Sequence, residues 1–165
     1  MGKQKKNKTD QTHPTLDIFV AGASDQRSRV VKRYWEQHVQ DYPERASIYF
    51  SWTQKRSIVT SVENFLDGQP DGIVNLIAHS YGGDTACWAV SDLARFKQKA
   101  VTRLVTVDPV SMLRPSIDWI RRGAEFWINL VAQPSEPDAS DLIATCGGKW
   151  LEWPDKMADI HYAVD

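Results

Sequence analysis

The chain has 165 residues, the size of a single domain, which is long enough to bury a hydrophobic core without help from disulfides or metals. Hydrophobic residues make up 42% of it and charged residues 25%, the balance of an ordinary globular protein, which excludes a long disordered chain. No apolar run approaches the roughly 18–20 residues needed to cross a bilayer, so we expect no integral membrane segment.

Charge is unevenly distributed along the chain. Lys and Arg number 20 against 21 Asp and Glu, a net charge of −1, yet four of the lysines fall within the first eight residues. Without that tip, 16 basic residues face 21 acidic ones, so the rest of the chain carries about −5. Because a nucleic-acid-binding protein normally shows a basic stripe, we expect no nucleic-acid partner. Residues 1–14 are predicted to form a disordered basic tail and residues 15–165 a single domain.

Targeting and redox signals are few. No apolar segment follows the basic tip, which argues against a secretory signal peptide, and Lys6 stands where a myristoylation motif needs Ser or Thr. Cys87 and Cys146 lie far apart and have no metal-ligand spacing, which favours two reduced structural thiols. We therefore expect a cytoplasmic protein, or one exported without a cleavable signal, with no metal and no organic cofactor.

Short β-type runs alternate with helical spacing along the rest of the chain. Between residues 26 and 40, apolar side chains recur at intervals of one and four residues and mark one face of a helix. Residues 73–78 are almost all apolar, as expected of a central strand covered on both faces. The expected strands are 15–20, 46–52, 73–78, 101–107, 126–132 and, more weakly, 160–164, and the expected helices are 26–40, 54–66 and 82–96.

The later part of the chain is less regular. Residues 111–122 are predicted to form a loop with a short helix, and residues 141–146 a helical turn. The spacing between strands is long enough for parallel crossovers, so the fold class is α/β, a three-layer sandwich with a mostly parallel central sheet. In such sheets ligands bind beyond the carboxyl ends of the strands, where we therefore look for chemistry.

The segment directly after the strand 73–78 is the strongest functional signal. It reads Ala78-His79-Ser80-Tyr81-Gly82-Gly83, with a hydrophobic strand before it and a predicted helix after it. This is the setting of a nucleophile elbow, G-x-S-x-G, here with Ala78 in place of the first glycine. A serine on such a sharp, strained turn leaves no room for bulk two residues to either side, and Ala78 and Gly82 meet that requirement. The alternative is a glycine-rich strand-to-helix turn in which Ser80 only caps the helix.

A strand, the sequence AHSYGG and a helix together resemble the serine hydrolases of the α/β-hydrolase fold, in particular their lipase and esterase branch. The resemblance covers about residues 15–165 in the order of elements, and only the elbow is specific. It implies a minimal α/β-hydrolase fold with Ser80 as nucleophile. Five or six strands are expected against the family's usual eight, and the missing ones would be at the front edge, which carries no catalytic residue.

The resemblance also implies a catalytic triad in the order serine, acid, histidine. On that order, His161 takes the proton of Ser80; the alternative is an ordinary strand or surface histidine. Asp108 is best placed for the acid, since it follows the strand 101–107 directly, while some relatives place the acid after the next strand, where Asp138 and Asp141 lie. A turn or capping role is the alternative for Asp108.

The resemblance further implies an oxyanion hole of two N–H donors. One is the backbone N–H of Tyr81, and the other comes from the loop after the first strand, at Gly22, Ala23 or Ser24, for which we take Ala23. Many relatives carry His-Gly in that loop, where this chain has Ala21-Gly22-Ala23.

Several neighbouring residues are interpreted as structural. Asp25 is expected to cap the following helix, His79 to pack on the strand face opposite Ser80, and Cys87 to lie in the core. Four of the seven Trp residues fall in the last third, and Trp119 lies in the segment after Asp108. Such a segment either covers the site and lines an acyl pocket, or packs as ordinary core.

The function expected from this pattern is a serine esterase or lipase-like hydrolase that cleaves carboxylic esters, lipid esters included, through an acyl-enzyme on Ser80. Small-molecule or lipid esters are thus the expected partners. Two alternatives remain: a non-catalytic binding protein built on a decayed hydrolase fold, and a lipase-type toxin that degrades phospholipid.

Overall fold

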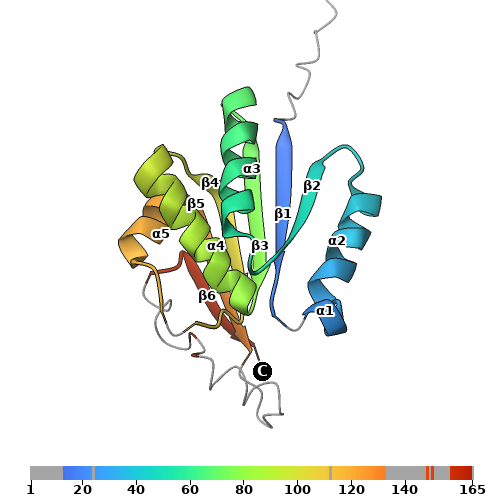
Figure 1. Cartoon of the computed structure of the whole chain (residues 1–165), viewed down its shortest axis with the longest axis vertical. Helices are drawn as coiled ribbons and strands as arrows, with labels where there is room; N and C mark the ends of the chain where they lie inside the picture. The colour runs from blue at the N-terminus through green and yellow to red at the C-terminus, as the bar shows by residue number, and fades with distance from the viewer. Residues whose placement is uncertain are drawn as a thin grey trace, which may run out of the picture.

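Six parallel strands form one sheet in the computed structural model, which describes residues 13–23, 25–111, 113–132, 148, 150 and 157–164 (Figure 1). Their order across the sheet is β2-β1-β3-β4-β5-β6, and every neighbouring pair is parallel. The strands are β1 (Thr15–Ala21), β2 (Ala46–Ser51), β3 (Ile73–His79), β4 (Val101–Val107), β5 (Ala124–Ala132) and β6 (Ile160–Val164). The predicted α/β class and parallel sheet are confirmed.

The helices follow the expected alternation with one difference, a break within the first predicted helix. They are α1 (Asp25–Ser28), α2 (Val30–Asp41), α3 (Lys55–Gly68), α4 (Tyr81–Asp92), which continues as a π-helical turn over Leu93–Lys97, and α5 (Ile117–Gly123). The single helix predicted over 26–40 is wrong, because Arg29 adopts a left-handed φ of 53° and separates α1 from α2. The helical turn predicted at 141–146 lies outside the described residues, as do residues 1–12 of the predicted tail.

Strand order and crossover handedness together decide which face each helix covers. The connection from β1 to β2 runs toward one edge of the sheet, whereas those from β2 to β3, β3 to β4 and β4 to β5 all run toward the other. Since parallel crossovers are right-handed, α2 must lie on one face and α3, α4 and α5 on the opposite face. Figure 1 shows the latter three helices together in front of the strands, with α1 and α2 at the β2 side.

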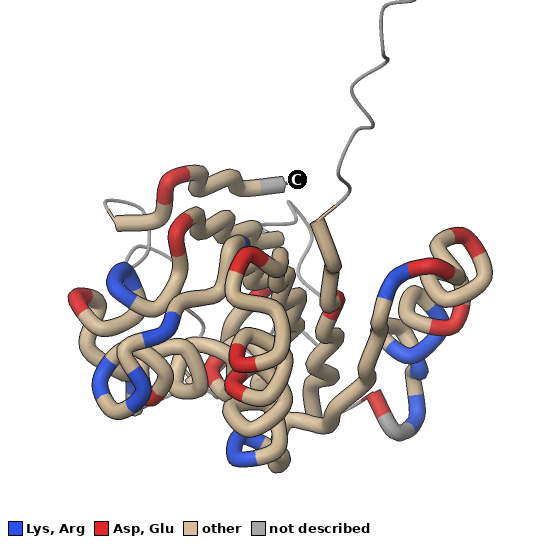
Figure 2. The backbone as a smooth tube through the Cα atoms, turned by 90° about the horizontal axis from the view of Figure 1, so that it is seen from above, with Lys and Arg blue, Asp and Glu red and all other residues tan. Residues whose placement is uncertain are grey.

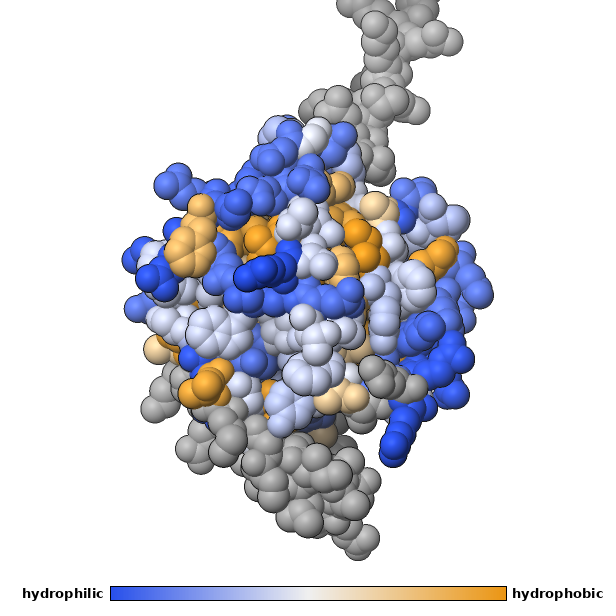
Figure 3. Space-filling model, viewed as in Figure 1, coloured by the Kyte–Doolittle hydropathy of each residue, from blue (hydrophilic) through white to orange (hydrophobic). Residues whose placement is uncertain are grey.

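The main hydrophobic core lies between the sheet and α3, α4 and α5. Alternate strand residues that point to these helices, such as Leu76, Leu104 and Trp127, are wholly buried. The outer surface over these helices is mostly hydrophilic (Figure 3). Acidic and basic residues are interspersed along the described part of the backbone (Figure 2). A smaller core of Phe19, Ala21 and Val31 lies beneath α2.

The opposite face of the sheet is only partly covered. Ile77, Val105 and Ile128 point away from α3–α5 and stay partly exposed, although their strand neighbours on the other face are fully buried. We call this the open face. Among the described helices, none is long and apolar enough to cross a membrane.

Candidate active site at the carboxyl edge of the sheet

Ser80 occupies a strained turn between β3 and α4. Its backbone has φ 56° and ψ −129°, a conformation that a residue with a side chain rarely adopts. Such strain costs on the order of 1–3 kcal/mol and persists only where the surrounding structure enforces it. The strand-turn-helix context on which the elbow interpretation depended is therefore present.

Three backbone hydrogen bonds hold this turn in place. The N–H of Ser80 donates to the carbonyl of Val107 over 2.9 Å. The carbonyl of Ser80 accepts from Gly83 over 2.8 Å and from Val110 over 3.3 Å. The strained residue is thus tied to the end of β4, the first turn of α4 and the loop after β4 at once.

Small residues let three segments close around the elbow. A Cβ atom on Gly82 would lie 2.5 Å from the carbonyl oxygen of Val20, and one on Gly83 would lie 2.9 Å from Cβ of Pro109. A Cβ atom on Gly22 would lie 2.8 Å from Cβ of Ser80. Each distance is shorter than real Cβ contacts, so glycine is required at all three positions; the sequence argument had identified Gly82 alone.

The loop after β1 meets the elbow where oxyanion donors were predicted. Gly22 packs directly against Ser80, and the turn is closed by a 3.2 Å hydrogen bond from the N–H of Asp25 to the carbonyl of Gly22. Ala23 lies in this turn and is exposed, while Ser24 is outside the described residues. Tyr81 is the first residue of α4, so its N–H has no acceptor within the helix.

Asp108 is brought to the same edge as Ser80. The N–H of Ser80 bonds to Val107, the residue before Asp108, so the two side chains leave adjacent strand ends. Asp108 has a left-handed φ of 46°, its N–H donates to Leu130, and its Oδ1 accepts from the N–H of Ala132 over 2.6 Å. The carboxylate is thereby anchored to the end of β5. The alternative acids, Asp138 and Asp141, lie outside the described residues.

The structure does not bring His161 to this edge. His161 pairs with Asn129, Asn129 with Thr106 and Thr106 with Ala78, so three strand spacings separate it from the level of Ala78. At about 4.8 Å per strand this is about 14 Å. A catalytic serine needs its oxygen about 3 Å from a ring nitrogen of the base. The side chains of Ser80 and His161 are too short to meet across three strands.

A series of side-chain hydrogen bonds ends at the ring of His161. The indole N–H of Trp127 donates to Thr106 Oγ1 over 3.0 Å, and Thr106 donates to Asn129 Oδ1 over 2.7 Å. The Asn129 amide then faces Nδ1 of His161 at 3.0 Å. Because the amide nitrogen of Asn129 only donates, Nδ1 of His161 accepts in this hydrogen bond. A triad histidine needs the reverse, with its Nδ1 proton directed to the acid.

The other three histidines do not replace it. His38 Nε2 lies 2.9 Å from Asp17 Oδ2, and His13 lies at the amino end of β1. His79 is adjacent to Ser80 but makes no hydrogen bond to it, and burial lowers the pKa of its ring although Asp108 and Asp25 favour the charged form. The residues that the structure describes therefore bring Ser80, the loop after β1 and Asp108 together, with no imidazole bonded to Ser80.

Asp25 has the capping role predicted for it. Its carboxylate accepts from the N–H groups of Val31 over 2.9 Å and Lys32 over 3.3 Å, in the first turn of α2. The hydroxyl of Tyr49 donates to it over 2.7 Å. Burial and this bond to Asp25 raise the pKa of Tyr49 to about 12.

Asp84 is a titratable residue near the elbow that the sequence argument missed. It lies one helical turn after Ser80 on α4, and burial raises the pKa of its carboxyl to about 6, against smaller opposing effects of Ser111, Trp88 and Arg114. Its Oδ1 is buried without a hydrogen-bond partner among the described residues. The spacing of four residues from Ser80 was the available signal.

Trp127 and Trp150 pack as core. Both are fully buried, and Trp150 donates its backbone N–H to Pro109 over 3.1 Å and its indole N–H to Ser111 over 3.3 Å. Trp150 therefore braces the loop after β4. Trp119 lies under the guanidinium of Arg122, while Met112 and Trp153 are outside the described residues. Cys87 is buried in the core as expected, and burial raises the pKa of its thiol.

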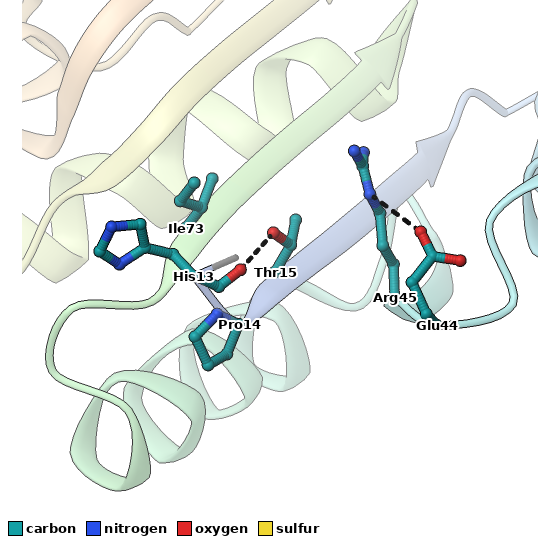
Figure 4. A pocket seen from close by; sticks show the side chains of 6 residues that line it. All are labelled: His13, Pro14, Thr15, Glu44, Arg45 and Ile73. Carbon is teal, nitrogen blue, oxygen red and sulfur yellow. Dashed lines mark hydrogen bonds and ion pairs between the residues drawn. The ribbon is translucent and has the colours of Figure 1, made fainter. Parts of the chain in front are cut away.

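Two cavities flank the sheet at opposite ends. A cavity of about 510 Å³ lies at the amino ends of β1 and β3, between His13 and the Glu44–Arg45 pair, far from Ser80 (Figure 4). A second, of about 300 Å³, lies beside Ser80 on the open face and is bordered by His79 and Val107. Within the described ranges, no three His, Cys, Asp or Glu side chains gather as a metal site.

Comparison with known proteins adds no assignment. No model of a known protein family matches the sequence, and no curated protein matches it. The functional argument therefore rests on the geometry of this edge.

Proposed function

We propose that the protein is a serine hydrolase that cleaves carboxylic esters through an acyl-enzyme on Ser80. One observation carries the proposal: the serine holds a strained backbone conformation at the junction of a central strand and a helix. Strain of this kind is retained at functional sites, because a capping role alone would be met without it. The three glycines that allow close approach around the turn, Gly22, Gly82 and Gly83, support the same interpretation.

The reaction has two steps. Ser80 Oγ adds to the ester carbonyl carbon, the N–H groups of Tyr81 and Ala23 stabilise the oxyanion, and the alcohol leaves with the serine proton. Water then adds to the acyl-enzyme, releases the carboxylic acid and restores the hydroxyl. Asp108, anchored to β5, supplies a carboxylate at the same edge.

A fluorophosphonate probe tests the nucleophile. We expect covalent labelling of the full chain, retained in Ser116→Ala and lost in Ser80→Ala, measured by intact mass. Ser116 is a matched control because it is an exposed serine that also precedes a helix. An unlabelled wild-type protein that hydrolyses no p-nitrophenyl ester from acetate to laurate would contradict the proposal.

A second candidate function is a non-catalytic binding protein on the same fold. The observation in its favour is the hydrogen bond of His161 to Asn129, which places this imidazole away from Ser80. The variant His161→Gln tests whether His161 acts as the base or has a structural role. If His161 is the base, its loss reduces the labelling rate by a factor of about 100 or more. If it is structural, the rate stays within about twofold of wild type in the folded variant.

A further inference from the structure

The cavity beside Ser80 has the lining of an alkyl-binding site. It lies between α2 and the open face, and its volume of about 300 Å³ is at the lower end for small-molecule pockets. The side chains that line it are mostly aliphatic or aromatic: Phe19, Val30, Val31, Tyr34, Ile77, Ala78, His79 and Val107. Because burial lowers the pKa of His79, its ring presents a neutral surface there.

One end of this cavity coincides with the catalytic edge. His79 directly precedes Ser80, and Val107 directly precedes Asp108. The carbonyl of Val107 accepts the N–H of Ser80, so these two wall residues are held beside the nucleophile by the same bond that holds the elbow.

The floor and the rim differ in exposure. Phe19 and Val31 are buried and belong to the small core under α2, whereas Val30 and Tyr34 are exposed on the solvent side of the cavity. The cavity is thus open along one side, so a flexible chain can enter it from the solvent. A bound alkyl chain would displace water from the apolar floor. At about 30 Å³ for each water-sized group, its volume of about 300 Å³ holds about ten such groups, which is enough for a chain of eight carbons.

We propose that this cavity binds the alkyl chain of the acyl group, and that the preferred substrates are esters of unbranched medium-chain acids. The inference rests on the proposed function, because the chain is placed by its bond to the acyl carbon at Ser80. It goes beyond that function by naming α2, rather than the loop after β4, as the element that selects the acyl group.

A chain-length series tests the proposal on the full chain. For p-nitrophenyl esters from acetate to decanoate, we expect kcat/KM to rise about two- to fourfold per methylene up to about eight carbons and then to level off. Val30→Trp, at the rim, should lower the octanoate-to-acetate ratio of kcat/KM by about tenfold. Val39→Trp is the matched control, an exposed valine on the same helix outside the cavity, and should keep the wild-type ratio.

A binding measurement separates this proposal from the proposed function. Sodium octanoate should bind Ser80→Ala, and the added Val30→Trp change should weaken that affinity about tenfold, whether or not the enzyme turns over. If the wild-type protein is not labelled by the phosphonate but still binds octanoate, the hydrolase proposal is contradicted and the cavity assignment stands. Normal labelling with an octanoate-to-acetate ratio that Val30→Trp does not change would overturn the cavity assignment alone.

Discussion

At the scale of single residues, the site depends on how closely backbone segments approach Ser80. The elbow combines a positive φ at a serine with glycines wherever another segment touches it. The strain and the close approach are linked, because the loop after β1 can reach Ser80 only if residue 22 has no side chain. The small size of the residues around Ser80, more than their charge, therefore determines how closely these segments pack.

Gly22→Ala should damage the site directly. The new Cβ atom would lie 2.8 Å from Cβ of Ser80 and 3.3 Å from its Oγ, so the loop or the serine must move. We expect a loss of about 1–3 kcal/mol in the free energy of unfolding and a phosphonate labelling rate at least tenfold lower. Gly68→Ala at the end of α3 is the control, since nothing lies within 4 Å of its Cβ position, and it should leave both quantities close to wild type. Equal labelling by both variants would refute the contact argument.

Asp84 should make stability depend on pH. Burial raises the pKa of its carboxyl to about 6 in the folded protein, above the ordinary 3.8 of an unfolded chain. The folded state therefore binds the proton more tightly, and the stabilisation present below about pH 4 is lost as pH rises through 6. Asp84→Asn should raise the free energy of unfolding at pH 7.5 by about 1 kcal/mol, less than the full pKa difference implies because the carboxyl is partly solvated.

Urea unfolding at pH 4, 5, 6 and 7.5 measures this effect. Asp71→Asn, at an exposed loop carboxyl, is the control and should follow the wild-type curve. A fall in stability between pH 4 and 6 that persists unchanged in Asp84→Asn would assign the pH dependence to another group.

At the scale of elements, β4, β5 and β6 are joined by side chains as well as by their backbone ladder. The chain from Trp127 through Thr106 and Asn129 to His161 crosses three adjacent strands inside the main core. Thr106 and Asn129 are wholly buried, so each polar atom there depends on its neighbour. This network explains how an edge strand that is short and carries exposed Tyr162 is held in register.

Thr106→Val should break this network without changing its shape. The methyl group fills the space of the hydroxyl but leaves Asn129 Oδ1 without the donor at 2.7 Å. We expect a loss of about 2 kcal/mol in the free energy of unfolding, together with faster hydrogen exchange in β6. Thr60→Val, at an exposed position on α3, should change stability by less than about 0.5 kcal/mol. A Thr106→Val protein as stable as Thr60→Val would show that the network is not a structural tie.

At the scale of the whole molecule, strand order and the hand of the crossovers determine where a ligand can bind. Only the connection from β1 to β2 runs against the direction of the others, so among the described helices α1 and α2 are the ones on the open face. The cavity beside Ser80 lies at the boundary between the part of that face under α2 and the part left open. Its position is thus a consequence of topology rather than of any local motif.

The elements and the elbow were largely predictable from the sequence. The boundaries of β3, β4 and α3 agree closely with the predicted runs, because alternation, helical spacing and breaker residues are local properties. The break at Arg29 was not predictable in this way. It depends on Asp25 turning back to cap α2, and a helical apolar pattern continues through the break regardless.

What the sequence determined by itself is the α/β class, the elbow at Ser80 and the small residues it requires, because each depends on neighbours in the chain. What only the tertiary structure decided is which distant residues meet there. It places Asp108 at the same edge and His161 three strands away, because lateral distance in a sheet follows the order of strands, which no local pattern encodes. The hydrogen bond between His161 and Asn129 and the cavity under α2 were decided at the same level, since both arise from side chains contributed by several strands.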